Sequence, residues 1–155
     1  MPPAWSPVQQ WKHAAEDPKD WIHLANKPFC CAMKHHDGDA HAYPTLQVTA
    51  RPGRIGHGDV QRFLEAQMLN LRTRFPDIRF LTRTSDAVIG GHRANLIEAT
   101  FRLHASHAMF GVRTRSYAVF APRYVFTIGL SGSDDPVFSS PDDFDRIETS
   151  VRIEP

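Results

Sequence analysis

The chain has 155 residues, of which 41% are apolar and 23% are charged, and 18 basic and 17 acidic side chains give a formal net charge of +1. This length suits one domain, so we expect residues 1–155 to form a single domain with a short irregular start over 1–7. The composition excludes a chain that is disordered for lack of apolar residues, and the small net charge argues against a general polyanion binder.

Signals for a membrane or an oxidising compartment are weak in this sequence. No apolar run approaches the length of a membrane-spanning helix, and the start Met-Pro-Pro-Ala-Trp-Ser lacks the basic and apolar regions of a signal peptide. The two cysteines, Cys30 and Cys31, are adjacent and therefore provide no disulfide framework. We therefore expect a cytoplasmic protein with no membrane span.

The first third of the chain predicts short strands separated by turns. Residues 8–11 and 21–24 form a predicted N-terminal hairpin, and strands follow at 29–33 and 45–50. Between the latter two lies the polar segment 35–41, which contains a glycine and is typical of a hairpin loop.

A helix is predicted from about residue 59 to residue 75. Asp59 is placed to accept hydrogen bonds from the first turn, and Phe75-Pro76 ends the helix. Its apolar residues recur at offsets of 3, 4, 8, 11 and 15 and so trace one helical face: Val60, Phe63, Leu64, Met68, Leu71 and Phe75.

Several antiparallel strands are predicted after this helix. The Gly90-Gly91 pair suits a tight turn, and Phe110-Gly111 is predicted to form a second turn. Between these turns, apolar and polar residues alternate from Ile97 to Leu103, which is typical of a strand with one buried face. The predicted strands cover 78–84, 86–89, 94–104, 112–117 and 124–130.

The last predicted element is a helix over about 141–150. Ser140 is a candidate N-cap, Pro141 suits the first helical position, and Asp142 and Asp143 complement the helix dipole. The order of elements therefore predicts an α+β fold. It has an antiparallel sheet of about six to seven strands, made of the N-terminal hairpin and a C-terminal meander, and two main helices flank this sheet.

The small net charge hides a segregation along the chain. Residues 1–50 hold four Lys and five acids, 51–123 hold twelve Arg and five acids, and 124–155 hold two Arg and seven acids. Either the basic middle pairs with the acidic C-terminal segment inside the fold, or it leaves a basic face that docks an acidic partner. The sequence leaves both interpretations open.

The candidate partner-binding residues lie in this basic middle segment. Arg113, Arg115 and Tyr117 alternate along one predicted strand and therefore share a face, and Arg102 on the preceding strand is expected beside them. Arginine and tyrosine on one strand face suit a protein partner. Such a face is also typical of a platform for single-stranded nucleic acid, but the balanced net charge argues against a nucleic-acid partner.

The chain resembles the PsbP/Mog/DcrB-like superfamily over about residues 8–153. The resemblance rests on Asp20-Trp21-Ile22, the helix 59–75, the turn segment 89–96, the strand 124–128 and the closing segment 142–153. It implies a non-catalytic protein, with adaptor or chaperone-like roles in bacterial secretion or assembly, and a protein partner of unknown identity. No cofactor is expected. The exposed sheet edges expected in such a fold would also allow two copies of the chain to pair as a homodimer.

The alternative function is that of a metal- or small-molecule-binding protein, or an enzyme, that uses the segment 35–41. Imidazole and carboxylate groups are transition-metal ligands, but this cluster lies in one loop without a clear second half. The weak candidate ligands are the histidines His35, His36, His41, His104 and His107. Vicinal Cys30 and Cys31 do not match the Cys-x-x-Cys redox pattern, so we expect one buried and one exposed thiol.

Overall fold

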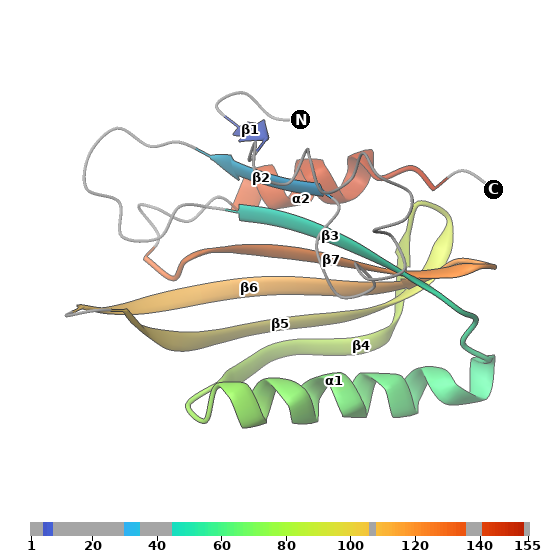
Figure 1. Cartoon of the computed structure of the whole chain (residues 1–155), viewed down its shortest axis with the longest axis horizontal. Helices are drawn as coiled ribbons and strands as arrows, with labels where there is room; N and C mark the ends of the chain where they lie inside the picture. Colours follow the sequence, from blue (N-terminus) through green and yellow to red (C-terminus); the bar gives the residue numbers. More distant parts are fainter. Residues whose placement is uncertain (1–4, 8–29, 35–44, 106–107, 136–140, 154–155) are drawn as a thin grey trace.

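A computed structural model describes residues 5–7, 30–34, 45–105, 108–135 and 141–153 of the chain. In these residues an antiparallel sheet is flanked by two helices, so the predicted α+β class is confirmed (Figure 1). The strands are β1 (Trp5–Pro7), β2 (Cys30–Lys34), β3 (Thr45–Pro52), β4 (Arg79–Ile89), β5 (His92–Ala105), β6 (Ala108–Phe120) and β7 (Tyr124–Ser133). The helices are α1 (Val60–Arg74), which a short 3-10 turn (His57–Asp59) precedes, and α2 (Pro141–Ser150).

The sheet has the order β1-β2-β3-β7-β6-β5-β4, and all neighbouring strands are antiparallel. The last four strands form the predicted meander, and β3 pairs with β7 on its far side. Five strands have eight residues or more, whereas β1 and β2 are short. The predicted N-terminal hairpin, over 8–11 and 21–24, lies outside the described residues, so its contribution to the predicted strand number stays a prediction.

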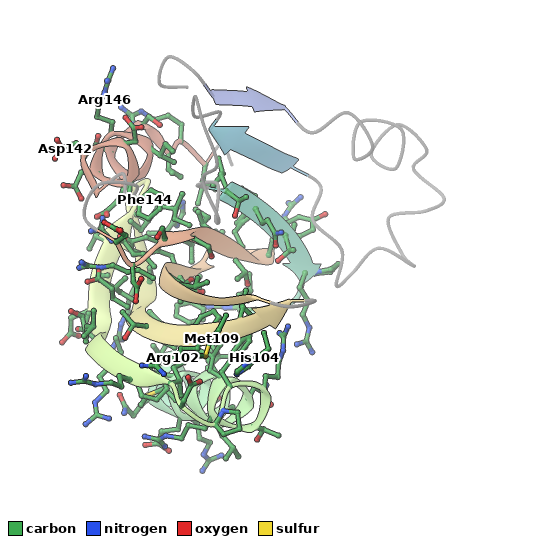
Figure 2. All side chains as sticks on the ribbon, turned by 90° about the vertical axis from the view of Figure 1, so that its left-hand side faces the viewer. Arg102, His104, Met109, Asp142, Phe144 and Arg146 are labelled. Atoms are coloured by element: carbon green, nitrogen blue, oxygen red, sulfur yellow. The ribbon has the colours of Figure 1, made fainter. Side chains whose placement is uncertain are left out.

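Each face of the sheet packs against one helix. Alternate residues of β5 show the reason, because Ile97 and Ala99 face α1, whereas Ala94 and Leu96 face the α2 side. Figure 2 shows the sheet curving between the two helices. The arrangement gives two apolar cores, one beneath each helix.

Helix α1 covers its face through the predicted apolar stripe. Val60, Leu64 and Met68 are buried, and Leu64 and Met68 pack against Ile97 of β5. The buried Asn95, 0% exposed, donates from Nδ2 to the Val60 backbone oxygen at 3.2 Å and so links β5 to the start of the helix. Two ring contacts add to this packing, Phe63 with Phe120 and Phe75 with Phe101.

The larger core lies beneath α2. Phe144 and Ile147 of the helix are buried there, and Val151 packs against the same core after the helix ends. Phe144, Ile147 and Val151 recur at offsets of 3 and 7, which places them along one helical face. Their buried neighbours from the sheet are Leu46, Ile89, Ala94, Tyr117, Val119, Ile128 and Leu130.

Three local predictions are wrong. Residues 78–84 and 86–89 are not separate strands but one strand, β4, because two register shifts, between Phe80 and Thr82 and between Thr84 and Ala87, bend it without ending it. Phe110-Gly111 is no turn, since both residues pair within the β5–β6 hairpin. Asp59 makes no side-chain hydrogen bond to the start of α1; its carboxylate lies 4.0 Å from Arg62 instead.

The Gly90-Gly91 turn is where the sequence predicted it. The two residues have φ angles of 57° and 83°, which glycine adopts without steric cost, and they join β4 to β5. A Cβ at Gly90 would lie 3.4 Å from the Ile153 side chain, so the segment after α2 packs closely over this turn. The predicted N-cap Ser140 lies outside the described residues.

Candidate functional site

The predicted site residues of β6 take part in a charged cluster between the sheet and α2. In the antiparallel register Arg115 lies opposite Glu98 of β5, and Arg113 lies one pleat further along the same face. The acidic residues Asp145 and Glu148 come from α2, about thirty positions later in the chain. We call Glu98, Arg113, Arg115, Tyr117, Asp145 and Glu148 the α2 cluster.

Arg115 is the centre of the α2 cluster. Its Nε lies 3.0 Å from Glu98 Oε2, and its Nη1 lies 2.6 Å from Asp145 Oδ1 and 3.4 Å from Glu148 Oε2. Arg113 donates to the other oxygen of Glu98 at 2.6 Å. The side chains of Glu98 and Arg115 are only 12% and 16% exposed, so the charge-assisted bond between these two residues is largely shielded from water.

Tyr117 joins the cluster to the apolar core. Its ring is buried, with the residue 1% exposed, and its hydroxyl donates to Glu148 Oε2. One residue therefore packs its ring in the core beneath α2 and anchors the helix by a polar bond at its tip.

The electrostatics of the cluster follow from this geometry. Burial alone would raise the pKa of the Glu98 carboxyl, but hydrogen bonds from Arg113 and Arg115 outweigh burial and lower this pKa. Burial would lower the pKa of the Arg115 guanidinium, and its bonds to Asp145 and Glu98 raise it instead. Burial and the bond to Glu148 both raise the pKa of the Tyr117 hydroxyl.

These contacts give the α2 cluster a structural role in the folded chain. Of the two interpretations of the segregated charge, internal pairing describes Arg113 and Arg115, because acidic side chains of β5 and α2 neutralise them. A partner could reach Arg115 or Tyr117 only after α2 had moved away. Arg113, whose side chain is 45% exposed, is open to solvent at the rim.

Arg102 is exposed and lies beyond the rim of the α2 cluster, one pleat from Arg113. It pairs with Gly111 near the end of the β5–β6 hairpin, on the same face as Arg113. Figure 2 shows it near His104 and Met109, close to α1 and away from Asp142 and Arg146 of α2. Together with residues 74–77 these side chains line an open hollow of about 600 Å³.

The predicted metal ligands are only partly within the described chain. His104 is exposed in β5, whereas His35, His36, His41 and His107 lie outside the described residues. Among the described residues, no three His, Cys, Asp or Glu side chains gather as metal ligands would. Binding of a metal by the segment 35–41 stays a prediction.

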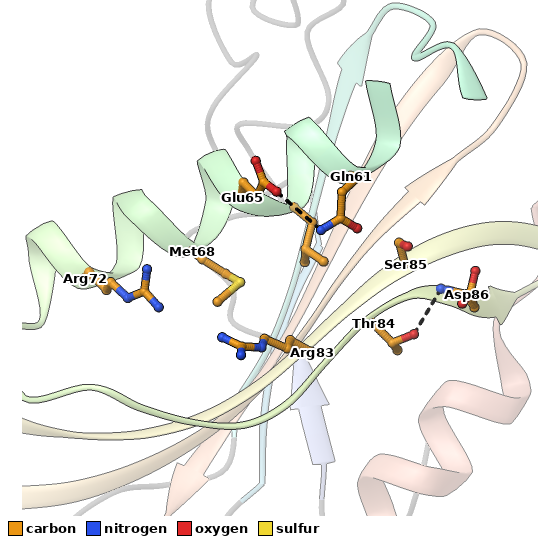
Figure 3. A pocket seen from close by; sticks show the side chains of 9 residues that line it. Gln61, Glu65, Met68, Arg72, Arg83, Thr84, Ser85 and Asp86 are labelled. Atoms are coloured by element: carbon orange, nitrogen blue, oxygen red, sulfur yellow. Dashed lines mark hydrogen bonds between the residues drawn. The ribbon is translucent and has the colours of Figure 1, made fainter. Parts of the chain in front are cut away.

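A second feature, missed by the sequence analysis, is a groove between α1 and β4. It has a volume of about 570 Å³. Leu64 and Met68, both almost fully buried, lie at its base. Figure 3 shows Arg72 of the helix and Arg83 of the strand reaching towards each other across it. We call this hollow the α1–β4 groove, and its other lining residues are Gln61, Glu65, Thr84, Ser85 and Asp86.

A spacing signal for this groove exists in the sequence. Gln61, Glu65, Met68 and Arg72 recur at offsets of 4, 7 and 11, which is one helical face beside the apolar stripe. The spacing could not show which strand lies opposite this face. That strand is known only once the sheet order places β4 at the edge next to α1.

The edge of β4 is itself a feature of the surface. β4 pairs with β5 on one side, and within the described ranges no strand pairs with its other side. Leu81 and Val88 of this strand are 50% and 68% exposed. A long strand edge with exposed apolar side chains is a template for pairing with another chain.

No helix among the described residues is long and apolar enough to cross a membrane.

Comparison with known proteins identifies structural neighbours but no family. No protein-family model matches the chain, and no curated protein matches its sequence. LpqN of Mycobacterium tuberculosis, described as involved in cell envelope biogenesis, matches with a TM-score of 0.65 and 15% identity, over 100% of this chain and 81% of LpqN. PA94 of Pseudomonas aeruginosa, a protein of unknown function, matches with a TM-score of 0.59 and 15% identity, over 81% of this chain and 82% of PA94. The chain shares its fold with these proteins.

Proposed function

We propose that the chain is a non-catalytic protein-binding protein of the PsbP/Mog/DcrB-like type. It acts as an adaptor or chaperone in a bacterial secretion or envelope-assembly system. The shared fold with LpqN supports the link to the cell envelope. A cytoplasmic setting is part of the proposal, because two adjacent cysteines offer no disulfide framework for an oxidising compartment.

The observation that carries this proposal is the unpaired edge of β4. The strand is eleven residues long and exposes Leu81 and Val88. Its two register shifts bend the edge, and such bulges oppose indiscriminate strand pairing. An edge that is apolar yet irregular favours one matching partner over open-ended self-association.

The α2 cluster supports the non-catalytic part of the proposal. Its carboxylates accept bonds from Arg113, Arg115 and Tyr117, so these groups stabilise the attachment of α2. Glu98, the most buried of these carboxylates, is held by two arginines and is therefore not free to take a proton from a substrate as a general base would. Arg102 and Arg113 keep exposed side chains and stay proposed partner contacts, on the face of the sheet that packs against α2.

Cross-linking in a lysate of the source organism tests this function. We expect the wild-type chain to cross-link to one polypeptide in stoichiometric amount, with cross-links to residues 79–89. The Leu81→Ser/Val88→Ser double variant should lower the yield at least fivefold, because it removes exposed apolar groups without adding charge.

The matched control is Tyr124→Ser, which replaces a side chain that is 41% exposed on β7. Its cross-linking yield should equal that of the wild type. Equal yields from the β4 variant and the wild type would contradict the proposal. Turnover of a small substrate by the purified chain without a partner would contradict it as well.

A further inference from the structure

We infer that the α1–β4 groove binds an extended acidic peptide segment of the partner protein. An apolar side chain of this segment lies over Leu64 and Met68, and a neighbouring carboxylate lies between Arg72 and Arg83. This inference deepens the proposed function and rests on it, because it names the chemistry of the segment that the sheet edge receives.

The first step of the argument is the shape of the groove. It is open along the edge of the sheet, and α1 and β4 form its two walls (Figure 3). Its base is apolar because Leu64 and Met68, 4% and 6% exposed, pack there on Ile97. An extended chain is thin enough to follow such a groove and can present alternate side chains to it.

The second step is the balance of charge within the groove. Of its two carboxylates, Asp86 lies 3.7 Å from Arg93, and Glu65 accepts a hydrogen bond from Gln61 at 3.5 Å. Neither carboxylate lies within ion-pair distance of Arg72 or Arg83.

The two arginines have no carboxylate partner among the described residues. Arg83 is exposed and makes no ion pair there, and the Arg72 guanidinium lies 5.1 Å from the centre of the Phe80 ring. The ring contact holds Arg72 at the groove without neutralising it. Two like charges that reach into one hollow repel each other, and a bound carboxylate would relieve this repulsion through charge-assisted hydrogen bonds.

The third step separates a peptide from other anions. A free phosphate or a nucleic-acid backbone would use the two arginines but would make no use of the small apolar surface that Leu64 and Met68 leave open at the base. A peptide in which acidic and apolar side chains alternate can contact both the apolar base of the groove and its two arginines. The base and the arginines together therefore favour a peptide.

Fluorescence anisotropy with labelled octapeptides tests the inference. The probes alternate Glu with Leu, Lys with Leu, and Glu with Ser, and labelled oligo-dT is the nucleic-acid probe. We expect the Glu-Leu peptide to bind at least tenfold more tightly than the Lys-Leu peptide and at least threefold more tightly than the Glu-Ser peptide. Its affinity should fall as salt is added.

The deciding variant is Arg72→Gln/Arg83→Gln, which should weaken binding of the Glu-Leu peptide at least fivefold. Arg123→Gln/Arg146→Gln removes the same charge from two exposed positions outside the groove and should leave the affinity unchanged. Absence of binding, equal binding of the acidic and basic peptides, or equal affinity of both double variants would overturn the inference. Tighter binding of oligo-dT, lost in Arg72→Gln/Arg83→Gln, would assign the groove to nucleic acid instead.

Failure of this inference and failure of the proposed function give different results. If the cross-linked partner is lost in the Leu81→Ser/Val88→Ser variant but kept in Arg72→Gln/Arg83→Gln, the function stands and the groove assignment fails. If no partner cross-links to the wild-type chain, the proposed function itself fails.

Discussion

Tyr117 places its hydroxyl in the interface between β6 and α2, where it donates to Glu148. Burial and this bond raise the pKa of the hydroxyl above the ordinary tyrosine value near 10. The folded chain therefore holds the phenol proton to a higher pH than the unfolded chain. Its contribution to stability is complete below about pH 10 and is lost as the pH rises towards the folded pKa.

An absorbance titration at 295 nm measures this behaviour directly. The chain has three tyrosines, and we expect one of them to ionise later than an ordinary tyrosine in the folded protein. The tyrosine that ionises at higher pH should be missing from the titration of Tyr117→Phe. In denaturant, its ionisation midpoint should return to the ordinary range for tyrosine. An ordinary midpoint for the component that Tyr117→Phe removes would contradict the assigned environment.

At the scale of elements, α2 is held on the sheet by the α2 cluster as well as by its apolar stripe. Phe144 and Ile147 supply the apolar part, and Arg115 links the helix to β5 through Glu98. Removal of Arg115 would leave the largely buried Glu98 carboxylate with Arg113 as its one remaining partner in the α2 cluster.

We therefore predict that Arg115→Met lowers the free energy of unfolding by about 2 kcal/mol, the usual cost of losing bonds between shielded charged groups. Urea unfolding followed by circular dichroism gives this value. Arg123→Met, at an exposed site on the β6–β7 turn, should change it by less than about 0.5 kcal/mol. Equal losses in the two variants would show that the α2 cluster adds no stability.

Across the whole molecule, the arginines of the basic middle segment include a paired group and an unpaired group. The β6 arginines are neutralised by Glu98 and by the acidic α2, whereas Arg72 and Arg83 stay unpaired within the described chain. The unpaired part lies at the same edge as Leu81 and Val88 of β4. The proposed docking surface is therefore the α1–β4 side of the molecule.

The sequence predicted the helices and the fold class because their signals are local. Residue periodicity places Leu64 and Met68 on one face of α1, and Gly90-Gly91 supplies the positive φ angles of the turn. The same alternation correctly put Arg113, Arg115 and Tyr117 on one strand face.

Periodicity does not tell which element covers that face. Helix α2 covers Arg115 and Tyr117, and this helix begins more than twenty residues further along the chain. The α1–β4 groove escaped prediction for the same reason, since the strand beside α1 follows from the order of the whole sheet. The bulges of β4 also left no local signal that distinguishes one bent strand from two short ones.

Hydrogen–deuterium exchange of the chain with and without its cross-linked partner tests the central claim most directly. Amides on the unpaired edge of β4 should exchange rapidly in the free chain and become protected in the complex. We predict increased protection over 79–89 and 60–74 and no change over 141–150. Protection confined to 141–150, or unchanged exchange over 79–89, would contradict the assignment of the α1–β4 side as the docking surface.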